Sequence, residues 1–551
     1  MQKYFWLVLI NASMLLAACE GAEPQATSAP ATPVAADSEQ VGEADANANA
    51  EAAAEAAKLQ AMVAGISANP WKWTSLDTSD ETVTVENPGR YLVTFNDDGS
   101  VEIQADCNRA LGTYSTEGAN LTIEIGPSTL AACPDDSRSE QFLQLLGDTD
   151  QALPLGNQLF ASLKEEDTTM ILEAVLTTVV DLCGEQALAI NTIEDTLAPE
   201  ISAQLDQGLV SMVQGPPHPG AGVTMLIITP KGRYFKSTGV SNVVTCDPLP
   251  ADSPFQIGSN TKLMTSAILF QLQEEGVLST SDLLSKWLPD HANRVPNGDK
   301  ITIDMLLTHT SGLHDYFAIP TANGTTIEDG TNDEAMLIRA FTPEELVTLV
   351  AESGLSDFEP GAEGKWNYSN TGYILLGLLI EKATEKSYEE NLNTRIIKPL
   401  GLTNTYLQTG QPNEGALPQA YYTTPFEFST GEWDASQGWA AGAVVSTPDD
   451  FATFLKALFT GELYNDPATL DLMKQHTDAG INALGEGTVY AHGMLDNNGV
   501  LGHGGQTLGF QSDGGYVVSD DVTIVIWGNT ADSNVQRAIV PDIVTTVVGG
   551  N

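Results

Sequence analysis

The amino-acid sequence predicts an α/β sandwich, in which helices flank an antiparallel sheet and a mostly helical lobe is inserted between the two halves of the sheet. A small β-rich domain precedes it. Short runs that alternate apolar and polar residues, broken by Asp-Gly and Gly, fill residues 71–176. After residue 180, strand-like runs near both ends enclose a long stretch of helical periodicity over residues 283–459. Because domains cluster near ~100 to 200 residues, the 551-residue chain is expected to form two folded domains plus appendages.

The first residues predict export. Lys3 precedes two short apolar runs, and Leu16-Ala17-Ala18-Cys19 follows, so residues 1–18 are interpreted as a signal peptide. The small residues before Cys19 resemble a bacterial lipobox, in which that cysteine carries lipid; an ordinary cleaved signal with an incidental cysteine is the alternative. Residues 19–65, rich in Ala, Glu, Pro, Thr and Ser, are predicted to be a disordered tether. We therefore expect an exported lipoprotein of the cell envelope, at the outer membrane or the outer face of the cytoplasmic membrane.

The charge of the chain excludes one class of partner. With 73 acidic and 23 basic residues, the formal net charge is -50. Nucleic-acid binding draws most of its affinity from basic patches, so we expect no nucleic-acid partner. Charge-driven binding to anionic lipid is excluded for the same reason.

Four cysteines remain after Cys19. An even number in an exported chain permits two disulfides, and four cysteines allow three connectivities. We favour Cys107 with Cys133 and Cys183 with Cys246, because this pairing keeps each bridge within one proposed domain. No C-x-x-C spacing is present, which disfavours a zinc or thioredoxin-like role.

The β-rich domain is assigned to residues 66–176. Strands are predicted at 91–95, 101–103 and 121–125. Its landmarks resemble the META (HslJ-like) domain: Trp71 and Trp73, the turn from Phe95 to Gly99, Cys107-Asn108, Gly112-Thr113-Tyr114, and the segment from Thr129 to Pro134. This resemblance implies a small envelope-associated module without a defined chemistry. It supplies a fold more than a function, and no protein partner follows from it.

The larger domain is assigned to residues 177–551. A helix is predicted over 193–213, followed by strands at 223–229 and 233–239 and by a helix that begins at Ser259. Near the end of the chain, residues 515–519 and 522–527 alternate as a hairpin. A closing helix is predicted over 534–548.

Three short motifs in this domain point to an active-site serine. Ser259 and Lys262 lie about one helical turn apart, so the amine faces the hydroxyl. A lysine whose ammonium form is disfavoured by burial can accept the serine proton near neutral pH, and no triad histidine is then required. The other two motifs are Tyr368-Ser369-Asn370 and His503-Gly504-Gly505.

Together these motifs resemble the serine β-lactamase and penicillin-binding protein superfamily, in the branch of class C β-lactamases and Streptomyces-type D-alanyl-D-alanine carboxypeptidases. The segments from Leu306 to Leu313 and from Gly502 to Gln506 match in the same order. The resemblance implies a β-lactamase/transpeptidase-like fold over roughly residues 195–548. It also implies that Tyr368 exchanges a proton with the nucleophile and the leaving atom, and that Asn370 bonds to the lysine and the substrate.

The third motif departs from the class C pattern. His503 replaces the lysine of K-T-G, and Gly504 replaces a threonine whose hydroxyl the family uses toward the substrate carboxylate. A histidine titrates near pH ~6.5, so carboxylate recognition is expected to be weaker or pH-dependent. Gly505 lets the strand approach the substrate closely. By analogy, the N–H groups of Ser259 and Gln506 form the oxyanion hole.

A metal site was weighed and set aside. His309 and His314 lie five residues apart with Asp315 adjacent, but no H-E-x-x-H motif or third partner is apparent. His309 falls within the family's I-T-I to L-L-T-H-T-S-G-L segment, which is interpreted as structural. No metal or cofactor is predicted.

The sequence thus predicts an envelope-anchored serine hydrolase that works through an acyl-enzyme on Ser259. A D-alanyl-D-alanine carboxypeptidase acting on peptides that end in D-amino acids comes first. An esterase or a weak β-lactamase on the same site are alternatives, because the fold hosts all three. The alternative of another class is a catalytically silent envelope binding protein.

Overall fold

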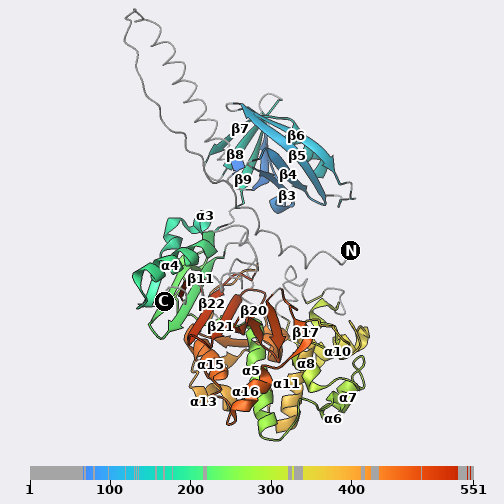
Figure 1. Cartoon of the computed structure of the whole chain (residues 1–551). Helices are drawn as coiled ribbons and strands as arrows, with labels where there is room; N and C mark the ends of the chain where they lie inside the picture. Colours follow the sequence, from blue (N-terminus) through green and yellow to red (C-terminus); the bar gives the residue numbers. More distant parts are fainter. Residues whose placement is uncertain are drawn as a thin grey trace, which may run out of the picture.

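The computed structural model describes two folded bodies within residues 66–547 (Figure 1). It leaves out short segments in this range: 68–69, 79–80, 97, 118–119, 130, 132, 135, 156–157, 165–167, 176–177, 215–219, 321–325, 328–338, 411–415, 423–432, 486, 532–542 and 544–545. The predicted signal peptide and tether therefore lie outside the described residues, as does most of the predicted closing helix. Among the helices that are described, none is long and apolar enough to cross a membrane.

The first body is a closed antiparallel barrel. From β3 to β9 its strands follow one another in chain order, β2 pairs with β1, and β1 pairs with both β3 and β9, which closes the sheet. Closure removes exposed sheet edges. The strands are β1 (Trp71–Asp77), β2 (Thr82–Thr84), β3 (Tyr91–Phe95), β4 (Ser100–Ala105), β5 (Asn108–Glu117), β6 (Asn120–Ser128), β7 (Thr149–Leu155), β8 (Gln158–Leu163) and β9 (Thr169–Ala174).

Aromatic side chains fill the barrel. Helix α2 (Ser139–Gly147) contributes Phe142, whose ring stacks on Trp73 with centroids 5.6 Å apart. Tyr91 meets both rings edge-on. These side chains belong to a hydrophobic cluster of their own, separate from the clusters of the second body. The barrel therefore has an independent core.

The second body is built on a ten-stranded antiparallel sheet, in which nine strands lie along one continuous path and a short tenth strand pairs beside it. Strand β11, near the start of this domain, pairs with β22, near its end, so the two ends of the domain meet at the centre of the sheet. The strand order is β10 (Asn191–Asp195), β12 (Gly232–Asn242), β11 (Gly222–Thr229), β22 (Val522–Gly528), β21 (Gln511–Val517), β20 (Val500–Gln506), β19 (Leu495–Asn497), β18 (Thr488–Ala491) and β17 (His476–Ile481).

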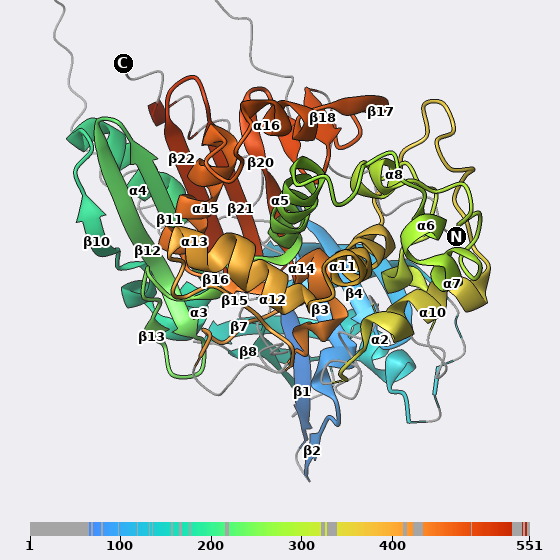
Figure 2. The same ribbon diagram turned by 90° about the horizontal axis from the view of Figure 1, so that it is seen from below.

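Helices cover both faces of this sheet because its central strands are apolar on both sides. On β22, Ile524 and Ile526 join the cluster under α4 (Pro199–Gln214), whereas Val525 and Trp527 join the cluster on the opposite face. That opposite face carries α5 (Thr261–Glu274) and α15 (Pro448–Thr460), seen in front of the sheet in Figure 2. The result is the predicted α/β sandwich.

A mostly helical lobe is inserted between α5 and β17. Its helices pack on α5, on α15 or on one another; they are α6 (Leu284–Trp287), α7 (Pro289–Ala292), α8 (Ile303–Leu307), α10 (Pro343–Ser353), α11 (Asn370–Thr384), α12 (Tyr388–Leu392), α13 (Lys398–Leu400), α14 (Trp439–Gly442) and α16 (Pro467–Met473). Short strands β14 (Phe255–Gln256), β15 (Tyr406–Leu407) and β16 (Val444–Ser446) form a separate small sheet.

One predicted element was wrong in its first part. The helix expected over 193–213 begins only at Pro199, and residues 191–195 form strand β10 instead. This segment pairs along the edge of β12, from Asn191 opposite Ser237 to Asp195 opposite Tyr234. Proline is well tolerated in the first turn of a helix, so Pro199 marks where the helix starts.

Two disulfides are present. Cys107 is bonded to Cys133 within the barrel, and Cys183 is bonded to Cys246 within the second body. The second bond ties α3 (Val179–Cys183) to the turn between β12 and β13 (Asp247–Pro248). Each bond therefore lies within one body.

Candidate active site

Ser259 lies in a tight turn where the chain passes from the small sheet into α5. Residues Gly258–Asn260 form one turn of 3₁₀ helix, and the serine side chain is half-exposed. Gly258 has φ +53°, and a Cβ there would lie 2.7 Å from the backbone nitrogen of Gln506. Glycine is therefore required at 258, and its absence of a side chain lets the Ser259 turn contact strand β20.

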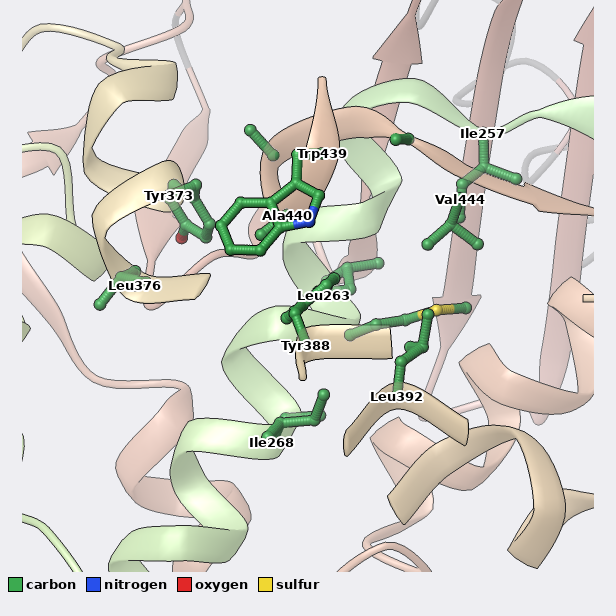
Figure 3. Close-up of a cluster of buried hydrophobic side chains, with 14 of the residues drawn as sticks. Ile257, Leu263, Ile268, Tyr373, Leu376, Tyr388, Leu392, Trp439, Ala440 and Val444 are labelled. Atoms are coloured by element: carbon green, nitrogen blue, oxygen red, sulfur yellow. The ribbon is translucent and has the colours of Figure 1, made fainter. Parts of the chain in front are cut away.

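A rigid apolar core supports this turn. Figure 3 shows Leu263 and Ile268 of α5 facing Tyr388 and Leu392 of α12, with Trp439 of α14 alongside. All but Trp439 are fully buried. Close packing of this kind fixes α5, and with it the distance between Ser259 and Lys262.

Lys262 is fully buried one turn further along α5. Its Nζ atom lies 3.1 Å from Ser259 Oγ, 2.7 Å from Asn370 Oδ1 and 2.8 Å from the carbonyl oxygen of Ala441. Burial lowers the pKa of this lysine to about 7, while the nearby negative charge of Asp315 acts in the opposite direction. The amine is thus substantially neutral at neutral pH.

Three oxygen atoms surround the amine, so an ammonium group would donate to all three, and loss of its proton changes the role of one of them. A neutral –NH₂ group has two N–H donors and one lone pair. The carbonyl oxygens of Asn370 and Ala441 can only accept, so they take the two N–H donors. The lone pair is then directed at Ser259 Oγ, where it can accept the hydroxyl proton. This geometry is the one that a general base for Ser259 requires.

The orientation of the Asn370 amide is set by Asp315. The Nδ2 atom of Asn370 donates to Asp315 Oδ2 at 2.8 Å, and its backbone N–H donates to the same oxygen at 3.1 Å. This leaves Asn370 Oδ1 directed at Lys262. Burial raises the pKa of the Asp315 carboxyl, whereas its hydrogen bonds and Lys262 lower it. Asp315 therefore holds the amide and partly balances the charge of the lysine.

Tyr368 borders the same cleft, just before α11. Its ring lies against Lys262, whose Nζ is 4.8 Å from the ring centroid. On another side the ring of His309 is 4.3 Å away, centroid to centroid. The tyrosine thus lies beside Lys262 and lines the same cleft as Ser259.

The backbone of β20 passes close to the nucleophile at Gly505 and Gln506. A Cβ at Gly505 would lie 1.9 Å from the carbonyl oxygen of Ile257, so only glycine fits at 505. Asn260 braces the junction, because its Nδ2 donates to the Ile257 carbonyl and to Ser512 Oγ. The Ser259 turn and Gln506 are thereby adjacent, as the predicted oxyanion hole requires.

His503 has a different place from the one expected. Its side chain is only 4 % exposed, and it is not among the described residues that line the cleft. Nε2 lies 3.0 Å from the hydroxyl of Tyr490, and Nδ1 bonds to the carbonyl oxygen of Gly504. The imidazole therefore contacts the protein, whereas the sequence predicted contact with a substrate carboxylate.

The cleft over Ser259 has a volume of about 460 Å³. Aromatic and small side chains make up much of its wall, together with Ser259, Asn370 and Gln506. Among its described lining residues there is no lysine or arginine, and Asp315 is the one acidic group. The aromatic lining residues are Phe317, Tyr368, Tyr422 and Trp433.

The histidines considered for metal binding have protein partners. His314 Nδ1 lies 2.7 Å from Asp357, and His309 bonds to the hydroxyl of Tyr490 and to the backbone N–H of Ser369. Within the described part of the chain, no group of three or more His, Cys, Asp or Glu side chains is arranged to hold a metal ion.

Comparison with known proteins agrees with this arrangement. The β-lactamase family matches residues 211–545, which is more than half of the chain. The protein belongs to the serine β-lactamase and penicillin-binding protein superfamily. The META domain matches residues 64–175, the part that forms the barrel.

Curated relatives within the superfamily have different names. Penicillin-binding protein 4* of Bacillus subtilis is 34% identical over 31% of this chain and 34% of its own length. Esterase EstB of Burkholderia gladioli is 28% identical over 34% of this chain and 46% of its own length. The chain thus spans less than two thirds of the curated relatives that it matches.

Solved structures of the superfamily cover this domain almost completely. A D-stereospecific amidohydrolase from Streptomyces sp. is 25% identical with a TM-score of 0.51, covering 65% of this chain and 100% of the other. D-amino acid amidase from Ochrobactrum anthropi SV3, complexed with D-phenylalanine, is 26% identical with a TM-score of 0.51, covering 63% and 97%. The β-lactamase fold of the superfamily is therefore present.

The structure brings together Ser259, Lys262, Tyr368, Asn370, Gly505 and Gln506, all named from the sequence. It adds Asp315, Tyr490 and the carbonyl oxygen of Ala441. Sequence reasoning met Asp315 only as a neighbour of His314, and nothing in the sequence marked Tyr490. The role of the Ala441 carbonyl oxygen could not be predicted from the sequence, because every residue has a backbone carbonyl group.

Proposed function

We propose that this protein hydrolyses amides and esters of D-amino acids through an acyl-enzyme on Ser259. Neutral Lys262 accepts the hydroxyl proton as Ser259 Oγ attacks the carbonyl carbon. The developing oxyanion is bound by the backbone N–H groups of Ser259 and Gln506, a contribution typically of about 3 kcal/mol per donor. Tyr368 passes the proton to the leaving amine or alcohol, and water then releases the acyl group.

One observation carries the choice of substrate. The described lining of the cleft has no lysine or arginine, and it includes the carboxyl group of Asp315. A buried charge needs a partner of opposite charge. Because the described lining of the cleft offers no permanent cation, a negatively charged leaving group would have no such partner there. A neutral amide or ester, with a cationic amino group elsewhere in the substrate, suits it better. The D-stereospecific amidohydrolase and the D-amino acid amidase among the similar solved structures support the same class.

A D-alanyl-D-alanine carboxypeptidase is the second candidate. It is favoured by the histidine in the third motif, which the Streptomyces-type carboxypeptidases share, and by similarity to penicillin-binding protein 4*. Against it stands the buried His503, since a peptide carboxylate would need that imidazole as its cation. A weak β-lactamase meets the same objection.

The test is a substrate panel at pH 8 with the full-length chain. It compares the amide of D-phenylalanine, the amide of its L-enantiomer, a p-nitrophenyl ester and a peptide that ends in D-Ala-D-Ala. We expect kcat/KM for the D-amide to exceed that for the peptide and for the L-amide by about tenfold or more, the size of one charged hydrogen bond. A higher kcat/KM for the D-Ala-D-Ala peptide would contradict the proposal and favour the carboxypeptidase.

We further propose that Cys19 anchors the chain to a membrane of the envelope, with residues 1–18 removed. Replacing Cys19 with serine removes the lipidation site and leaves the folded domains untouched. The Cys19→Ser protein should move from the membrane fraction to the soluble exported fraction, whereas a Cys133→Ser protein should stay in the membrane fraction. Unchanged membrane association of Cys19→Ser would contradict the anchor.

A binding protein without chemistry remains the rival from another class. It predicts that Ser259→Ala leaves every cellular phenotype of the protein intact. Our proposal predicts that Ser259→Ala behaves as a deletion of the gene, while the amount of folded protein is unchanged.

A further inference from the structure

Three buried side chains form a continuous hydrogen-bonded chain behind Tyr368. His309 follows α8, Tyr490 lies on β18, and His503 lies on β20. His309 Nε2 is 3.0 Å from the hydroxyl oxygen of Tyr490, which is 3.0 Å from His503 Nε2. All three side chains are less than 5 % exposed. The proton transfers proposed above use none of them.

The groups at the two ends of this hydrogen-bonded chain determine which ring nitrogen of each histidine carries a proton. At one end, the backbone N–H of Ser369 donates to His309 Nδ1 at 3.2 Å, so a neutral His309 carries its proton on Nε2. At the other end, the carbonyl oxygen of Gly504 can only accept, so Nδ1 of His503 carries a proton. Nε2 of a neutral His503 is then an acceptor. Tyr490 consequently accepts from His309 and donates to His503.

Protonation would break this pattern. A second proton on His503 would direct two N–H donors at the Tyr490 oxygen and turn the phenol O–H away. The titratable groups on the same side are Lys262, His309, Tyr368, Tyr490 and Tyr373, whose hydroxyl also bonds to Tyr490. Asp513 lies beside Gly514, the strand partner of His503, and its side chain points to the opposite face of the sheet.

Burial acts in the same direction. It lowers the pKa of His309 well below the usual value, and a positive charge on Lys262 or on His503 would lower it further. A cation on either ring would therefore lie in a buried region that already holds Lys262. Geometry and burial both favour two neutral imidazoles.

We infer that His309 and Tyr490 are positioning residues that hold His503 as the neutral tautomer with its proton on Nδ1, so that the third motif presents no cation to the cleft. This inference concerns the state of one side chain and does not depend on which substrate is used. If the proposed function also holds, the hydrogen-bonded chain of His309, Tyr490 and His503 explains why an uncharged leaving group is selected.

The test is ¹⁵N NMR of the histidine rings in the full-length chain. The chain has only seven histidines, so His503 and His309 can be assigned from the signals lost in His503→Gln and His309→Gln. We expect His503 to keep its proton on Nδ1 and to stay neutral from about pH 5.5 to 8, a range that spans the ordinary histidine pKa of ~6.5. His309 should carry its proton on Nε2 over the same range.

The Tyr490→Phe variant removes the donor to His503 Nε2. We expect the His503 ring of this variant to titrate, with its midpoint shifted up toward ~6.5, or to exchange between tautomers. Tyr464→Phe is the matched control, because it removes a buried hydroxyl that bonds to Met473 and to none of His309, Tyr490 and His503, and it should leave the His503 signals unchanged.

Titration of His503 near pH 6.5 in the unsubstituted protein, or its proton on Nε2, would overturn the inference. That measurement stands even if Tyr490→Phe fails to fold. It also needs no substrate, so a failure of the proposed hydrolase activity would be recognised separately.

Discussion

At the scale of single residues, the chemistry depends on one charge. Lys262 is buried and makes two hydrogen bonds to carbonyl oxygens, which leaves its lone pair for Ser259 only when the amine is neutral. Lysine is suited to this role because its pKa shifts readily on burial, whereas arginine stays protonated. The site is therefore in its active form only when Lys262 has lost its proton and is uncharged.

A pH profile follows from this charge. Burial lowers the pKa of Lys262 to about 7, so the lysine is a cation below that pH and a neutral base above it. We expect kcat/KM to rise about tenfold per pH unit below pH ~7 and to level off above pH ~8. In Lys262→Arg the guanidinium cannot become neutral, and activity should fall at least ~10³-fold at every pH. A profile that is flat from pH 5 to 9 would contradict the role of the lysine.

Asp315 gives a prediction with a definite sign. Its negative charge raises the pKa of Lys262, so Asp315→Asn should lower that pKa and move the acid limb of the profile to lower pH, by about one unit. The amide of the new asparagine can still accept from Asn370, so kcat on the plateau should fall less than about tenfold.

Asp357→Asn is the control for this measurement. Asp357 bonds to His314 and Asn367, whereas the hydrogen-bond partners of Lys262 are Ser259, Asn370 and Ala441. The acid limb of the pH profile of Asp357→Asn should coincide with that of the unsubstituted protein. A shift of the Asp315→Asn limb to higher pH would show that Asp315 does not act on the lysine through its charge.

How far the sequence predicts the site depends on the type of residue. Ser259, Lys262, Tyr368 and Asn370 are recognisable because each belongs to a short motif at a characteristic spacing. Asp315 is one of 73 acidic residues and has no motif of its own. The family pattern gave His503 its position in the third motif, but its burial depends on Tyr490, which comes from another strand.

At the scale of elements, the nucleophile depends on two backbones that touch. The surrounding atoms leave no space for a side chain at Gly258 on the Ser259 turn or at Gly505 on β20. The close approach places the turn beside Gln506. It also explains why the third motif is rich in glycine, since the strand there contacts another backbone on its inner face.

The Gly258→Ala substitution tests this contact. The added methyl group would lie 2.7 Å from the backbone nitrogen of Gln506, so one of the two backbones must move. A displacement of about 1 Å at the nucleophile costs roughly 100-fold in rate, and we expect at least that loss of kcat. Gly276→Ala is the matched control: it also has a positive φ, +71°, but open space around it.

Gly276→Ala should cost only the backbone strain, about 1 to 2 kcal/mol of stability, and should leave kcat unchanged. Equal kcat values for the two variants, with both proteins folded, would mean that the contact with β20 does not position Ser259. Thermal melting and initial rates on the same samples decide this.

Elements far from the site show the limit of periodicity. Ile193, Leu197 and Ile201 follow one another at a spacing of four, which extends the helical pattern of α4 backward. The structure makes Ile193 part of β10 because the residues on either side of it pair with the edge of β12, Thr192 opposite Lys236 and Glu194 opposite Phe235. Such pairing joins residues about 40 positions apart and leaves no local signal, whereas Pro199 did mark the helix start.

At the scale of the whole molecule, two separate cores predict two unfolding events. The barrel has its own hydrophobic cluster and its own disulfide, and the second body has others. The sequence predicted this division from the change of pattern near residue 176. It predicted neither the closure of the barrel nor the order of its strands, which depend on the pairing of β1 with β9.

Removing one disulfide at a time tests the independence of the two bodies. Cys183→Ser with Cys246→Ser should lower the stability of the second body by about 2 to 4 kcal/mol, because the bond closes a loop of 63 residues. Cys107→Ser with Cys133→Ser should lower the midpoint temperature of the unfolding transition of the barrel only. In calorimetry, a single transition that moves with either pair would contradict two independent cores.

The central claim is that Ser259 is the nucleophile and that Lys262 activates it. Intact-mass spectrometry of the full-length chain with a fluorophosphonate tests this most directly, in the unsubstituted protein, Ser259→Ala and Lys262→Arg. The account predicts one adduct, mapped to Ser259, that is absent from Ser259→Ala and forms at least ~10³-fold more slowly in Lys262→Arg. No adduct on the folded unsubstituted protein, or an adduct that persists in Ser259→Ala, would contradict it.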